Sequence, residues 1–65
     1  MKVYVMTKYK PFGVEQYVGV KKTEKEAVEA FREMFPHMRG TVKDNNMSSD
    51  AHNTYVLSIK EVNLD

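Results

Sequence analysis

The chain has 65 residues, of which 42% are hydrophobic and 29% are charged, and its formal net charge is only +1. This length allows a single domain over residues 1–65, and the near balance of charge provides no overall field that would attract nucleic acid. The absence of cysteine excludes disulfides and thiolate zinc sites, so we expect so small a chain to gain stability as a homodimer. No signal peptide or membrane-spanning run is recognised, and a cytoplasmic location is expected, which is the host cytoplasm if the chain is phage-encoded.

Two strands joined by a turn are predicted at the start of the chain. Residues 2–9 are rich in β-forming side chains, with apolar residues at both odd and even positions, which is typical of a strand covered on both faces. Residues 10–13 read KPFG, with proline and glycine at positions that favour a β-turn. Residues 14–22 are predicted to form the second strand of an antiparallel hairpin.

An amphipathic helix is predicted over residues 23–35. Thr23 and Glu26 have the spacing of a capping box, in which each side chain bonds the backbone N–H of the other residue. Pro36 disfavours the helical conformation at the residue before it, so the helix is expected to stop there. The apolar positions of this segment follow helical spacing and form one stripe, made of Ala27, Val28, Phe31, Met34 and Phe35.

Residues 37–53 are polar and rich in turn-forming side chains, and they predict a long loop that can include a short edge strand at residues 40–43. Residues 54–62 predict the last strand, because Tyr55, Leu57 and Ile59 alternate with more polar neighbours.

The expected fold is an α+β domain of ββαβ type. It has a three-stranded antiparallel sheet of order 2-1-3 with one helix across one face. The side chains expected to pack between sheet and helix are Val3, Val5, Val18, Val20, Leu57 and Ile59 from the strands and Phe31, Met34 and Phe35 from the helix.

The opposite face of the sheet is expected to remain uncovered, because one helix covers only one face. Aromatic and methionine side chains gathered on an exposed surface typically mark an interface. We therefore predict a non-enzymatic module that binds a protein partner, or a second copy, through this face. The residues assigned to this face are Tyr4, Met6, Lys8, Tyr17, Val56, Ser58 and Lys60, and the predicted contacts are Tyr4, Met6, Tyr17 and Val56.

An alternative use of the same face is nucleic-acid binding. Exposed tyrosine rings on a sheet can stack on bases while lysines contact phosphates. The lysines proposed for this role are Lys8, Lys21 and Lys60.

The sequence carries no recognisable catalytic or metal-binding pattern. His37, Asp44, Asp50 and His52 fall in the polar loop with a spacing that matches no ligand template, and we interpret them as solvated loop residues. A nucleophile elbow and a phosphate-binding glycine loop are both missing. We therefore predict that the protein is not an enzyme, and we assign it no cofactor, no metal and no pocket around the two histidines.

Segments of this sequence resemble two groups of known proteins. The segments KVYVMTKY, YVGVKKTEKEAVEAF and YVLSIKEV resemble short ββαβ proteins of phages, prophages and Gram-positive bacteria, which implies an accessory protein that binds a host protein. The stretch KPFGVEQYVGVKKTEKEAVEAF is similar to the AP2-like DNA-binding module of plant regulators and integrase arm domains. That similarity implies DNA contact through the sheet.

Overall fold

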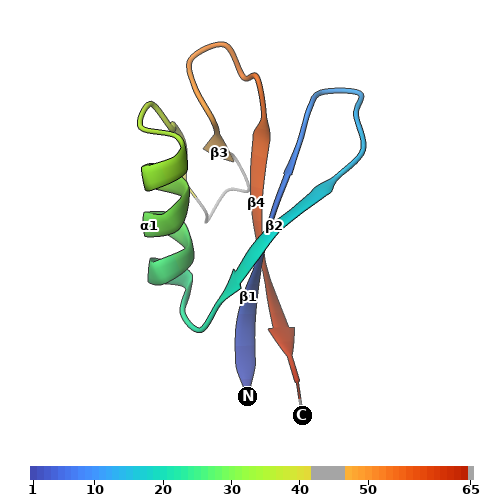
Figure 1. The fold of residues 1–65 in the computed structure, drawn as a ribbon, viewed down its shortest axis with the longest axis vertical. Helices are drawn as coiled ribbons and strands as arrows, with labels where there is room; N and C mark the ends of the chain where they lie inside the picture. The colour runs from blue at the N-terminus through green and yellow to red at the C-terminus, as the bar shows by residue number, and fades with distance from the viewer. Residues whose placement is uncertain (42–46, 65) are drawn as a thin grey trace.

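The computed structural model describes residues 1–41 and 47–64 and shows one antiparallel sheet with a helix against one of its faces (Figure 1). The sheet order is β2-β1-β4-β3. The predicted α+β, ββαβ fold is confirmed, with the first strand in the centre as expected, but the sheet has four strands instead of three. The elements in chain order are β1 (Lys2–Tyr9), β2 (Gln16–Lys21), α1 (Glu24–Met34), β3 (Met47–Ser48) and β4 (Val56–Asn63).

The fourth strand is a short edge strand within residues 37–53, as the sequence allowed, and it lies after the segment 40–43 suggested for it. It is the two-residue strand β3, in which Met47 pairs opposite Leu57 of β4 and buries its side chain. Gly40 has a φ of 95°, which a strand does not accommodate, and Val42 and Lys43 lie outside the described residues. A buried side chain therefore fixes this strand later in the loop than the β-forming residues suggested.

Helix α1 begins and ends where the sequence indicates. Thr23 has extended backbone angles, and its hydroxyl accepts a hydrogen bond from the N–H of Glu26 at 3.1 Å, which is the N-cap half of the predicted capping box. Phe35 leaves the helical conformation directly before Pro36. The helix buries Ala27 and Phe31 completely, and these two residues anchor it on the sheet. The prediction that Met34 packs in the core is wrong, because this last residue of α1 is 46% exposed.

The core between helix and sheet is small. Its largest fully buried side chains are Phe31 from α1, Met6 from β1 and Leu57 from β4. Tyr55 extends the core toward the loops, with its ring centroid 6.1 Å from that of Phe35. Because so few side chains are fully buried, each contributes a large share of the stability of the domain.

The face assignment predicted for β1 is wrong. Met6 pairs opposite Ile59, and both lie in the core under the helix, whereas Val3 and Val5 point to the other side of the sheet. Because successive strand residues alternate between faces, this one-residue difference moves every side chain of the strand. Both faces of β1 are apolar in sequence, so its period-two pattern could not decide between them.

A β-bulge also overturns part of the prediction for β2. The register shifts between the pairs Met6–Gly19 and Thr7–Tyr17, which leaves Val18 as the extra residue. Val18 packs against the core as predicted, but Val20 pairs with Val5 on the opposite face and is 46% exposed. The bulge thus separates two valines that strict alternation would keep together.

Candidate interaction surface

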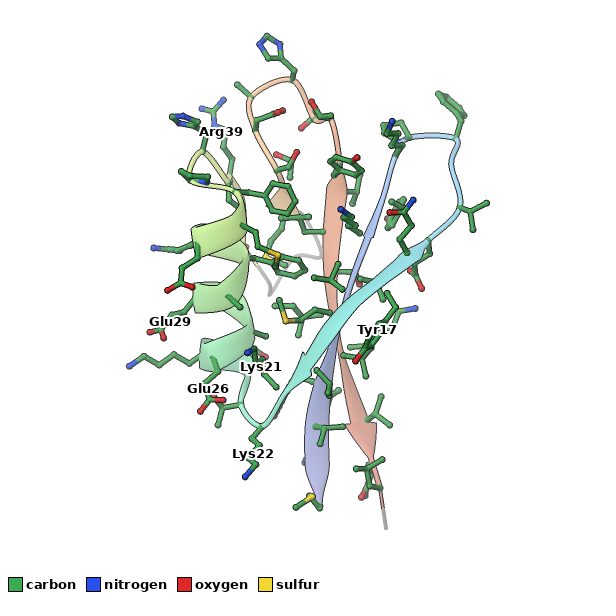
Figure 2. The ribbon with its side chains drawn as sticks, in the orientation of Figure 1. Tyr17, Lys21, Lys22, Glu26, Glu29 and Arg39 are labelled. Carbon is green, nitrogen blue, oxygen red and sulfur yellow. The ribbon has the colours of Figure 1, made fainter. Side chains whose placement is uncertain are left out.

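The sheet face turned away from α1 is not covered by any element in the described ranges 1–41 and 47–64. Its edge residues are well exposed, including Tyr17 at 69%, Val20 at 46% and Val62 at 36%. Figure 2 shows the Tyr17 side chain on the side of the sheet away from the helix. We call this surface the open face; the strand pairing assigns to it Val3, Val5, Thr7, Tyr9, Tyr17, Val20, Val56, Ser58, Lys60 and Val62.

Two of the four predicted contact residues lie on the open face and two do not. Tyr17 and Val56 are on it, as expected. Met6 is only 1% exposed in the core, and Tyr4 packs against that core, so both are withdrawn as contacts. The residues of β1 that do lie on the open face are the odd-numbered ones, such as Val3 and Val5. The sequence pattern of β1 could not distinguish them from the even-numbered residues.

The lysines of the nucleic-acid alternative do not share a face. Lys8 lies on the helix side of the sheet, where its ammonium is 4.9 Å from the centroid of the Tyr55 ring. Lys21 also points toward α1, near the helix glutamates (Figure 2). Lys60 alone lies on the open face, and its ammonium is 3.4 Å from the carboxylate of Glu15. The structure therefore does not form the predicted three-lysine phosphate surface.

A groove of about 480 Å³ crosses the open face next to the β1–β2 loop. The paired residues Tyr9 and Val56 contribute to its lining, and Gly13 lines it from the loop. Glu15 and Lys60, which form the ion pair described above, also line it. The groove therefore combines apolar side chains with one charge of each sign.

The β1–β2 loop carries the most exposed aromatic residue of the described chain. The N–H of Gly13 donates a hydrogen bond to the carbonyl of Lys10 at 2.8 Å, which closes a β-turn. Phe12, the third residue of that turn, has a φ of 67° and a side chain that is 111% exposed. The left-handed conformation costs a residue with a Cβ about 1–2 kcal/mol, and in this structure no burial offsets it. Phe12 was not among the predicted contact residues, although an aromatic residue in a tight turn is itself a sequence signal of a surface site.

A second hollow of about 550 Å³ lies near the C-terminal end of α1 and brings His37, Arg39, Asp50 and His52 together. This corrects the expectation that no pocket surrounds the two histidines. No group of three histidine or acidic side chains placed to hold a metal occurs in the described part of the chain, and Asp44 lies outside it.

Asp50 organises the loop around this hollow. Its carboxylate accepts hydrogen bonds from the N–H of His52 at 2.9 Å, from the N–H of Thr54 at 3.2 Å and from the Thr54 hydroxyl at 2.9 Å. The carboxylate is thus used inside the loop, as in other turns closed by aspartate.

Stability in acid is expected to depend on Asp50. The hydrogen bonds from Thr54 lower the pKa of Asp50 below its usual 3.8, with a smaller effect from the N–H of His52. Because the pKa of Asp50 is lower in the folded than in the unfolded state, its carboxylate stabilises the fold. This stabilisation is fully present above pH 3.8 and is lost as the pH falls through the pKa of the folded state. Asp50→Asn keeps an acceptor but removes the titration, so its melting temperature should fall less steeply below pH 3.8 than that of the wild type. Glu33→Gln is the control, and an unchanged acid profile in Asp50→Asn would contradict the role of this carboxylate.

Comparison of the chain with protein families, with curated proteins and with solved structures gives no match. In the described part of the chain, no helix has the length and apolarity needed to cross a membrane. The candidate surface therefore has to be interpreted from its own residues.

Proposed function

We propose that the protein is a non-enzymatic interaction module that binds protein through its open face. The observation that carries this proposal is a sheet face without a covering element in the described structure, on which Tyr17 is 69%, Val20 46% and Val62 36% exposed. The other apolar residues of the face are half-buried beside them. Apolar patches of this kind on small domains typically mark protein interfaces. Tyrosine at such a surface adds large contact area together with a polar group that can be hydrogen-bonded.

The charge of the open face favours protein over nucleic acid. Its one lysine, Lys60, is already paired with Glu15, so the face offers no excess positive charge to phosphates. An accessory role in a phage or bacterium, in which the module binds a host protein, agrees with the resemblance of the segments and is part of the proposal.

The proposal is tested by site-specific crosslinking in cells that express the chain. The photo-crosslinker p-benzoylphenylalanine is placed at Tyr17, and as a matched control at Glu29, an exposed residue on the outer side of α1 (Figure 2). Irradiation should yield a protein adduct from position 17 and none from position 29. Equal adducts at both positions, or none at 17, would overturn the proposal, and an adduct that nuclease removes would favour the nucleic-acid alternative.

A further inference from the structure

We propose that the occupant of the open face is a second copy of this chain, in a two-fold dimer in which Phe12 of each protomer enters the groove of the other. This inference rests on the proposed function of the open face and adds the identity of the partner. It starts from two features of one protomer that lie side by side: a projecting aromatic residue and a groove.

The projecting residue and the groove are neighbours in the structure. Phe12 is fully exposed, and the next residue, Gly13, lines the groove. In a two-fold interface each patch meets the same patch of the other protomer, so a projection beside a groove is self-complementary. The groove, at about 480 Å³, is large enough to accept an aromatic ring.

The charges of the groove also suit a second copy of the same face. The groove carries Glu15 from the β2 side and Lys60 from β4, with 3.4 Å between their charged groups. When two identical faces meet, each Lys60 can approach the Glu15 of the other protomer, so the apposition brings together opposite charges. A partner surface with an excess of positive or of negative charge would match only one of the two charged groups, Glu15 or Lys60, and would be repelled by the other.

The open face and the β1–β2 turn also offer surface area for an interface. A stable interface buries roughly 800 Å² per partner, which is about one-sixth of the 4834 Å² surface of this chain. At ~3.3 Å per residue and ~4.8 Å between strands, the three long strands present a face of about 26 by 14 Å. This outline alone is smaller than the required area, but the ring of Phe12 lies outside it on the turn and adds roughly 150–250 Å² when it is buried. The face and the inserted Phe12 together thus supply an interface toward the lower end of the size range of specific complexes.

The backbone of Phe12 provides a variant that separates folding from binding. Glycine adopts a positive φ without a steric penalty, so Phe12→Gly should fold at least as well as the wild type. Sedimentation over a wide concentration range should show a dimer for the wild type and a dimer dissociation constant at least tenfold higher for Phe12→Gly. Met34→Ala, which truncates an exposed apolar residue of α1, should leave the dissociation constant unchanged.

A charge exchange tests whether the partner is a second copy. Glu15→Lys gives a groove with two positive charges, and Lys60→Glu gives one with two negative charges. Each variant alone should dimerise more weakly than the wild type, and a mixture of the two should form heterodimers in preference to either homodimer. A mixture that shows no such preference would overturn the proposed interface.

The outcomes also separate this inference from the proposed function. A wild-type chain that stays monomeric, while the crosslinker at Tyr17 captures a different protein, would overturn the self-association and leave the open face as a binding surface. A dimer that Phe12→Gly leaves unchanged would overturn the insertion of Phe12. A monomer without any adduct at position 17 would overturn both proposals.

Discussion

Met6→Lys is expected to unfold the domain, with a loss of about 4 kcal/mol or more in the free energy of unfolding. The side chain of Met6 is 1% exposed between the sheet and α1, so a lysine there would bring an ammonium group into the core without a partner. A domain of this length is stabilised by roughly 3–10 kcal/mol in total. Circular dichroism during urea titration measures the loss.

The matched control for this substitution is Val5→Lys, one residue earlier in the same strand. Val5 lies on the open face, where the lysine ammonium can reach water, so we expect a loss of no more than about 1 kcal/mol. The comparison is made at a dilution at which the chain is monomeric. If Val5→Lys were the more damaging of the two, the register of β1 in the structure would be wrong.

Phe31→Ala is expected to have the second-largest effect, a loss of about 3–5 kcal/mol. The ring of Phe31 is completely buried, and its centroid lies 6.4 Å from that of Phe35, so truncation removes buried apolar area and leaves a cavity under the helix. For a domain of this size each kcal/mol lowers the melting temperature by about 4–8 °C, so the thermal transition should shift by more than about 12 °C or disappear.

Phe12→Ala makes the same chemical change at the fully exposed residue of the β1–β2 turn. It should change the stability of the monomer by less than about 1 kcal/mol, because it removes no buried contact and alanine retains the backbone cost of the positive φ. Equal losses for Phe31→Ala and Phe12→Ala would contradict the position of the core.

Local sequence signals were sufficient for the secondary structure around the helix. Thr23 and Glu26 mark the beginning of α1, and Pro36 marks its end, because capping and proline sterics act within a few residues. The density of β-forming side chains likewise identified β1, and alternation of apolar residues identified β4. The rule for right-handed crossover connections placed β1 in the interior of the sheet. These features depend on neighbours along the chain or on general rules of connection.

The composition of the open face, in contrast, was decided by contacts between strands. β1 has apolar residues on both faces, so its own pattern permits either Met6 or Val5 to face the helix. The pairing of β1 with β4 and the bulge at Val18 fix the choice, and neither is encoded by a period within one segment.

The loops show the same division between local and tertiary information. The sequence indicated a turn at residues 10–13, but the positive φ and full exposure of Phe12 follow from how the hairpin closes. His37 and His52 are far apart in sequence and line one hollow because the bridge between Arg39 and Ser48 joins the two segments that carry them. The sequence by itself determined the elements and their order, since these follow from local sterics and periodicity. The tertiary structure decided which side chains form the core and which form the open face, because strand register is a property of pairs of strands.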